Sequence, residues 1–149
     1  MLGRRWSGRE ELAVAAIRRE LAAHPLSVRD QGDLRAELLD CLAQSAVRAA
    51  AVAATVLVVF GEYVADTGHA PEVFRARLAE GEPLEIPAIL SRAMDRGEIE
   101  AGTLKPVVAT LVTTLFRHHV MMTLQAPAPE LCRQWVDDIF LPLVRKSAA

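Results

Sequence analysis

Two adjacent histidines, His118 and His119, are the residues whose type most directly suggests chemistry in this sequence. Imidazole rings bind transition metals and transfer protons near neutral pH. Neighbouring residues of a helix point about 100° apart, so this pair cannot chelate one ion from a regular helix. Neither histidine nor carboxylate stands three or four residues from His118 on either side. We therefore expect no metal site here, but a polar contact at a subunit interface or a pocket rim.

The other candidate groups also fail to form a catalytic constellation. Glu62 and Tyr63 interrupt a very apolar stretch, and they could either orient a ligand or mark the solvent-exposed end of a helix. The sequence contains no nucleophile elbow, glycine-rich phosphate loop, H-E-x-x-H or di-iron pattern. Cys41 and Cys132 lack the spacing of a metal or redox motif, so they are expected to be reduced core thiols of a cytoplasmic protein. We predict no catalytic residues, no cofactor and no enzyme.

Composition suggests more apolar surface than one core can hide. Hydrophobic residues make up 52% of the 149 residues, which favours an oligomer interface or a ligand cavity. The net charge of −2 gives the whole chain no electrostatic footprint for nucleic acid, although five arginines fall within the first nineteen residues. The longest nearly uncharged run, 49–60, is too short to cross a bilayer, so we expect no membrane contact.

The elements that would position these groups are all helices, because apolar residues recur at steps of three and four and never alternate. Ser7 and Glu10 have the spacing of a capping box at the start of a helix. Asp33 and Thr103 are placed to cap the starts of two later helices, and Pro106 suits a first helical turn. Gly97 is placed to end a helix. The pattern predicts helices over 8–23, 34–46 continuing through 49–64, 71–79, 84–96, 104–124 and 130–144.

The last two helices carry wide apolar stripes and are joined by a short break, so they must lie antiparallel and adjacent. Each can cover only part of the other's stripe. We propose that a second copy of the chain covers the rest, which makes the protein a homodimer. The residues expected in this interface are Val108, Leu111, Val112, Leu115, Trp135, Ile139 and Leu143. Pro142 is expected near the last turn, where its missing N–H costs little.

Two stretches resemble a known family. Residues 92–99, Arg-Ala-Met-Asp-Arg-Gly-Glu-Ile, followed by Pro106 and an apolar helix ending in Phe116-Arg117, resemble the C-terminal domain of TetR-family transcriptional regulators. Residues 2–12 resemble that family's junction between the DNA-recognition helix and the long connecting helix, with Gly3 where the family usually has tyrosine. The family's helix-turn-helix would precede this junction, so the sequence starts at its last turn.

The resemblance implies an all-α bundle of about six helices that dimerises through a four-helix interface. It implies that residues 1–6 are a remnant of the DNA-recognition helix and that residues 7–149 form an effector-binding and dimerisation domain. Arg4 and Arg5 would then lie near DNA phosphates, or would be ordinary helix-surface charge. Operator DNA is expected as a partner only if a helix-turn-helix is present.

The function implied is that of a ligand-responsive repressor that binds a small apolar effector. The pocket candidates, which core packing equally predicts, are Leu38, Leu42, Val56, Phe60, Leu90, Met94, Phe116 and Val120. One alternative is a stand-alone helical dimerisation module without DNA binding. Another is a small helical enzyme that uses His118, His119 or Glu62.

Overall fold

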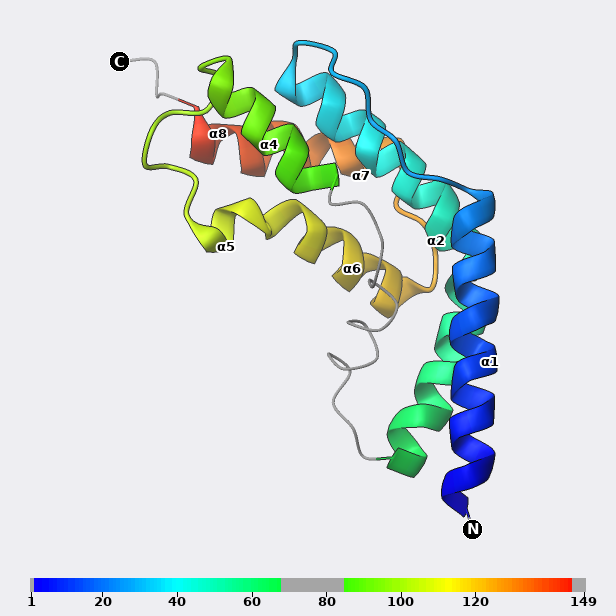
Figure 1. The fold of residues 1–149 in the computed structure, drawn as a ribbon. Coiled ribbons are helices and arrows are strands. Elements are labelled where there is room, and N and C mark those ends of the chain that lie inside the picture. The colour runs from blue at the N-terminus through cyan, green and yellow to red at the C-terminus, as the bar shows by residue number, and fades with distance from the viewer. Residues whose placement is uncertain (1, 68–84, 146–149) are drawn as a thin grey trace. The chain divides into compact units, whose positions relative to one another are not determined.

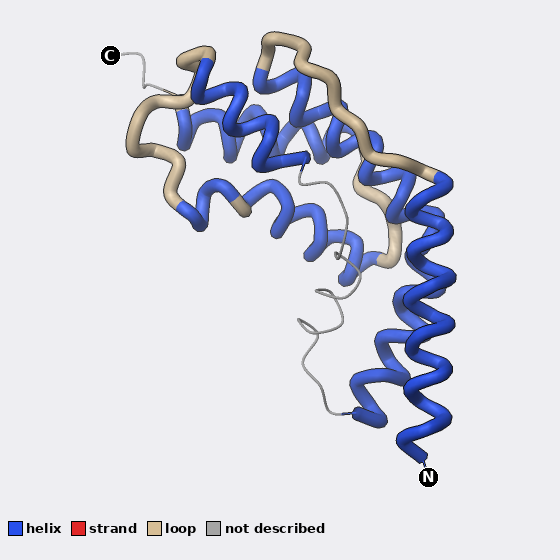
Figure 2. Tube along the Cα trace, in the orientation of Figure 1, coloured by secondary structure: helices blue, strands red, loops and turns tan. Residues whose placement is uncertain are grey.

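A computed structural model describes residues 2–67 and 85–145, with the backbone alone at 2–7, 9, 10, 13, 54 and 56–67. Every regular element in these ranges is a helix, as Figure 2 shows, which confirms the all-α prediction. The described residues belong to two compact units. One contains α1 and the part of α2 from Arg48 onward; the other contains Leu26–Val47 and everything from α4 to the C-terminal end of α8. The predicted helix over 71–79 lies outside the described residues.

The first unit is built on α1, Leu2–Ala23, and on the second half of α2, Leu34–Thr67. Helix α1 runs through Ser7 without a break, so the expected helix start at the capping box was wrong. Among the side chains of α1 that the structure describes, Val14 and Ile17 are buried, about one turn apart. The stretches 34–46 and 49–64 form one continuous helix, as the pattern allowed.

In the second unit, two carboxylates accept hydrogen bonds from backbone N–H groups at the N-terminal end of α2. The Ala36 N–H donates to the Asp33 carboxylate at 2.8 Å, so Asp33 caps the helix as predicted. The Leu34 N–H donates to Glu98 Oε1 at 3.1 Å, although Glu98 lies 64 residues away in sequence. Both bonds satisfy N–H groups that have no partner inside a helix.

Helix α4, Glu85–Asp95, ends at a glycine as predicted. Gly97 has a φ of +76°, and its N–H donates to the Met94 carbonyl at 3.0 Å while the Glu98 N–H donates to the Ala93 carbonyl at 2.9 Å. This pair of bonds is the Schellman motif, which favours glycine at its left-handed position. The turn carries Ile99 directly into the core, where it is buried.

The predicted helix over 104–124 is divided at Thr110 into α5, Pro106–Ala109, and α6, Leu111–Thr123. Pro106 opens the first turn as predicted. Thr103 does not cap it; its hydroxyl instead donates to the Glu100 carbonyl at 2.7 Å. Lys105 takes the capping position without a side-chain bond, because the loop before Pro106 is extended there.

The last helical run contains a wide turn before its proline. It consists of α7, Pro129–Gln134, the π-helix η1, Trp135–Phe140, and α8, Leu141–Val144. The Leu141 N–H bonds to the Val136 carbonyl, five residues back. A proline ring clashes with the carbonyl four residues before it in an α-helix, and the wider π turn relieves that contact ahead of Pro142. Pro142 lies two residues before the end of α8, as predicted.

Helix α6 packs on η1, and the two run in opposite directions, as Figure 1 shows, which confirms the predicted hairpin. His119 of α6 meets Trp135 edge to face, with ring centroids 5.9 Å apart. The core of this unit draws on α2, α4, α6 and the last helical run. Its largest fully buried side chains include Leu34, Leu38, Ile89, Val112, Val136, Phe140 and Val144.

A two-pronged ion pair ties α2 to η1. Arg35 Nε and Nη2 donate to the two oxygens of Asp137 at 2.7 and 2.9 Å. These bonds to Arg35 hold the pKa of Asp137 below its usual value of 3.8, and the same contact raises the pKa of Arg35.

Part of the chain's folding stability should therefore depend on pH through Asp137. A carboxyl whose pKa is lowered by folding contributes stability above its unfolded value, and that contribution is lost as the pH falls through the lower folded value. We expect the chain to lose stability below about pH 4, and the Asp137→Asn variant to lose less over the same interval. Urea unfolding followed by circular dichroism between pH 3 and 7 checks this. Equal acid sensitivity in both proteins would contradict it.

Candidate functional site

A pocket of about 420 Å³ opens in the second unit among α2, α4 and α6. This volume falls within the range of small-molecule sites in proteins. Part of its wall comes from the core, since Cys41, Leu42 and Val112 are buried. The described lining consists of Leu26, Cys41, Leu42, Ser45, Glu85, Ile86, Pro87, Ala109, Thr110, Val112, Thr113, Thr114, Phe116 and Arg117.

The loop before α2 is fastened so that Leu26 can form part of the wall. The Ser27 N–H donates to Gln44 Oε1 at 2.9 Å, and Gln44 Nε2 donates back to the Ser27 carbonyl at 2.9 Å. The Val28 N–H donates to Glu85 Oε2 at 3.2 Å, which joins the loop to the first turn of α4. The wall therefore consists of segments from distant parts of the chain, and specific hydrogen bonds join the loop to α2 and α4.

The pocket has polar groups among its apolar ones. The hydroxyls of Thr110 and Thr114 donate to the carbonyls one turn earlier in their own helix, at 3.2 and 2.9 Å, so they are satisfied locally. Glu85 and Arg117 supply one carboxylate and one guanidinium. An arrangement of this kind can hold an apolar body and orient a polar group, but it offers no nucleophile paired with a base.

Of the predicted pocket residues, Leu42 and Phe116 line this pocket. Leu38 and Leu90 lie in the core, with 0% and 4% of their surfaces exposed, and Met94 is half exposed on α4. Val120 is half-buried and does not appear among the described lining residues. The side chains of Val56 and Phe60 lie outside the described residues. Sequence reasoning missed Ser45, Glu85 and Arg117.

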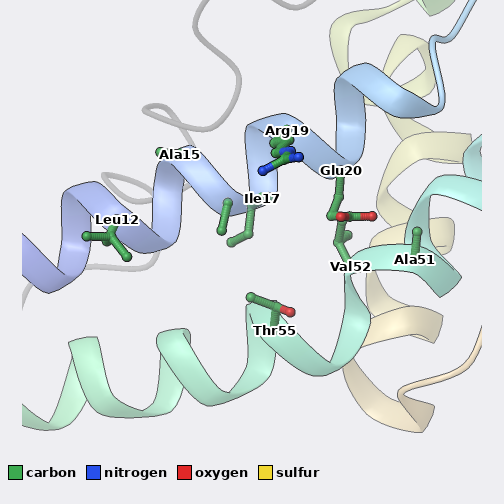
Figure 3. Close-up of a pocket in the computed structure, with 9 residues that line it drawn as sticks. Leu12, Ala15, Ile17, Arg19, Glu20, Ala51, Val52 and Thr55 are labelled. Carbon is green, nitrogen blue, oxygen red and sulfur yellow. The ribbon is translucent and has the colours of Figure 1, made fainter.

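A second hollow, of about 750 Å³, lies in the first unit between α1 and α2. Figure 3 shows Ile17 and Glu20 of α1 pointing toward the segment of α2 that carries Val52 and Thr55. Apart from Ile17, its walls are exposed or half-exposed, and Leu12 has 75% of its surface in solvent. We take the smaller pocket as the candidate site, because the buried core residues Cys41, Leu42 and Val112 form part of its wall.

The predicted interface residues fall into three groups. Val112 and Trp135 are buried within their own chain, with 2% and 7% exposed, because α6 and η1 pack on each other there. Val108, Leu111 and Leu115 are half-buried, and Val108 and Leu115 pack against the core. Ile139 and Leu143 are exposed, one helical turn apart. Other large apolar side chains exposed on the hairpin are Val107, Met121, Met122 and Leu124.

Comparison with known proteins decides the family. Residues 28–139 match the family described as "Tetracyclin repressor-like, C-terminal domain". The chain belongs to this family. A protein of Mycobacteroides abscessus described as "DNA-binding transcriptional repressor TetR" is 27% identical over 146 residues, which span 97% of this chain and 76% of the relative. No solved structure matches the chain. The assignment confirms the suspected family and makes the chain a regulator's domain, not an enzyme.

The stretch 92–99, on which the resemblance to TetR regulators is based, contributes two arginines that contact a buried carboxylate. Glu37 of α2 has 0% of its surface exposed. Its Oε2 accepts from Arg92 Nη2 at 2.7 Å, and its Oε1 accepts from the Gln31 N–H at 3.0 Å and lies 3.3 Å from Arg96 Nη1. The charge of Glu37 is therefore matched by two guanidinium groups and one backbone donor, as a buried charge requires.

The second arginine of the stretch extends this cluster to the loop. Arg96 Nη1 donates to Asp30 at 3.1 Å, and its Nε donates to Glu98 Oε2 at 2.9 Å. The Gly32 N–H, which donates to Asp30 at 2.9 Å, lowers the pKa of Asp30, and Arg96 adds to this effect. Since Glu98 also binds the Leu34 N–H at the start of α2, residues 96–99 of this TetR-like domain join α4, α2 and the preceding loop.

The remaining sequence candidates carry no further site in the described part of the chain. Both cysteines are buried, and burial raises the pKa of the Cys132 thiol, as expected of core residues. Among the described residues no three histidine, cysteine or carboxylate side chains gather as a metal site. No described helix is long and apolar enough to span a bilayer. The side chains of Arg4, Arg5, Glu62 and Tyr63 lie outside the described residues.

Proposed function

We propose that this chain is the effector-binding domain of a ligand-responsive TetR-like repressor and that its effector occupies the pocket among α2, α4 and α6. The observation that carries the proposal is the pocket itself, whose volume of about 420 Å³ suits a small molecule. The family match and the repressor relative support the regulatory role.

We also propose that the chain acts as a homodimer, joined by a four-helix interface that two α6–α8 hairpins form. The support is the apolar surface that the hairpin leaves exposed, including Ile139, Leu143 and Met122. Exposed apolar patches of this kind favour a protein contact. The half-buried residues Leu111 and Leu115 would lose their remaining exposure in such an interface.

The effector would act by linkage. A ligand that binds one arrangement of the helices more tightly than another shifts the population toward it, by no more than the difference in affinity. We assign the transmitting role to α2, because Leu42 and Ser45 line the pocket and Val52 and Thr55 of the same helix line the hollow beside α1. DNA binding by the repressor would respond through α1.

Blocking the pocket should abolish effector binding. Ser45 is half-buried on the pocket wall, so Ser45→Phe places a bulky ring in the cavity. We expect naphthylmethanol, a small apolar compound, to bind the unmodified chain with a micromolar to millimolar dissociation constant and to lose at least tenfold in affinity in this variant. Isothermal titration calorimetry measures both constants.

Val47→Phe serves as the matched control, because Val47 is exposed on α2, two residues from Ser45, and does not line the pocket. It should bind naphthylmethanol like the unmodified chain. Equal affinity in the Ser45→Phe variant would place the ligand elsewhere, and failure of both naphthylmethanol and its charged analogues to bind the unmodified chain would refute the pocket's role.

A further inference from the structure

The candidate pocket is amphiphilic, and residues of α5 and α6 form both an apolar row and a polar row in its lining. Ala109, Val112 and Phe116, at steps of three and four around α5 and α6, give the pocket an apolar row. Thr110, Thr113 and Arg117 follow each of them by one position and form an adjoining polar row. A molecule in this pocket therefore meets an apolar wall and a polar edge together.

Two charged residues line the pocket, and they differ in exposure. Glu85 is half-buried in the first turn of α4, where its Oε2 accepts the Val28 N–H at 3.2 Å. Arg117 is exposed on α6 and already takes part in an interaction of its own. Water and salt screen an exposed charge more strongly than a half-buried one. The carboxylate of Glu85 is therefore the stronger electrostatic feature that a ligand would meet.

This carboxylate can hold a further hydrogen-bond donor. An ionised carboxylate has about four acceptor positions, and the described residues place one backbone donor on Glu85. Beside it, Ile86 and Pro87 continue the apolar lining. A protonated amine at the end of an apolar body would satisfy both surfaces, through a charge-assisted bond that is stronger than a neutral one.

We propose, resting on the effector function argued above, that the pocket selects a cationic amphiphile: an apolar ring system with a protonated amine that pairs with the carboxylate of Glu85. The apolar body packs against Phe116 and Leu42. The hydroxyls of Ser45 and Thr113 are the neighbouring polar groups that line the same pocket. No covalent bond is made or broken, so the pocket would distinguish ligands by their binding affinity alone.

A charge series tests this selectivity. Naphthylmethylamine, naphthylmethanol and naphthoic acid share one ring system and differ in charge. We expect calorimetry on the full chain to give an amine affinity at least tenfold above that of the alcohol, with the acid weakest. In the Glu85→Gln variant the amine should fall to the affinity of the alcohol, while the alcohol's own affinity stays unchanged.

Glutamine keeps an oxygen that can accept the Val28 N–H, and an unchanged thermal unfolding midpoint would verify that the variant folds. Glu130→Gln is the control for loss of a negative charge elsewhere on the chain, because Glu130 is exposed on α7 and does not line the pocket, and it should preserve the preference for the amine. Equal binding of amine and alcohol, tightest binding of the acid, or an amine preference that survives Glu85→Gln would overturn the charge selectivity while leaving the pocket's function standing. Failure of all three compounds to bind would instead overturn the proposed function.

Discussion

Replacing Glu37 with glutamine is expected to lower the free energy of unfolding by about 3 kcal/mol, since removal of one partner from a buried ion pair typically costs 3–5 kcal/mol. The lower end applies because Arg92 and Arg96 keep 27% and 23% of their side-chain surfaces exposed, so water partly solvates the guanidinium groups left behind. For a chain of this length that loss lowers the thermal midpoint by roughly 10 °C. Urea unfolding measures the free energy directly.

The matched control is Glu130→Gln, because Glu130 also pairs with an arginine, Arg133, at 2.8 Å but keeps 71% of its side chain in solvent. We expect this exposed pair to contribute less than about 1 kcal/mol. A double-mutant cycle with Glu37→Gln and Arg92→Gln should show a coupling energy well above that of the exposed pair. Similar losses in the Glu37 and Glu130 variants would show that the buried cluster does not stabilise the fold as argued.

The double variant Ile139→Lys, Leu143→Lys is expected to convert the proposed dimer into a monomer. Burying one large apolar side chain contributes about 1.5–3 kcal/mol, so losing two of them in both subunits should weaken dimerisation by a factor of at least roughly 100. The added charges would also repel across a symmetric interface. Sedimentation velocity between one and one hundred micromolar measures the association.

Val47→Lys combined with Met94→Lys is the matched control, because these two apolar side chains are also about half exposed but lie on α2 and α4, away from the hairpin. The control variant should unfold at nearly the temperature of the unmodified chain, since it alters exposed positions away from the proposed interface. Dimerisation that persists in the hairpin variant would move the interface elsewhere, and a monomeric unmodified chain would refute it altogether.

The helix ends were predictable where a single residue controls the backbone. Asp33, Gly97 and Pro106 each act through their own side chain or φ angle, and each is placed as predicted. Thr103 was wrong, because several nearby carbonyls compete for a threonine hydroxyl and the Glu100 carbonyl is closer than any helix end. Local chemistry therefore determines much of the secondary structure, but not which partner a flexible polar group takes.

The sequence predicted less well which side of a helix packs against a neighbouring helix. Periodicity placed Val112, Trp135 and Ile139 on apolar stripes, and it could not tell that the first two pack within the chain while Ile139 stays exposed. The pocket shows the same limit, since Leu42 and Phe116 were foreseen but Glu85 was not. The site combines a loop, α2, α4 and α6, and their alignment depends on distant bonds such as that from Val28 to Glu85.

Glu37 had a sequence signal that went unused. It lies three residues after Leu34 and four before Cys41, which are both buried, so it belongs to the buried side of α2. Arg92 and Arg96 are spaced four apart, so both guanidinium groups can reach the same carboxylate. A carboxylate among leucines, together with such an arginine pair elsewhere, is the pattern of a buried charge with two partners.

The π turn of η1 sets the rotational phase of the chain's last helical residues. In an α-helix, residues four apart drift by about 40° around the axis at each step, so a row of them spirals away from any flat surface. Cys132, Val136, Phe140 and Val144 are nevertheless all buried, because a turn closed by a bond five residues back rotates less per residue. A regular α-helix through the same residues would instead turn α8 by roughly 90° more, which would aim Val144 away from the core and carry Leu143 off the exposed side.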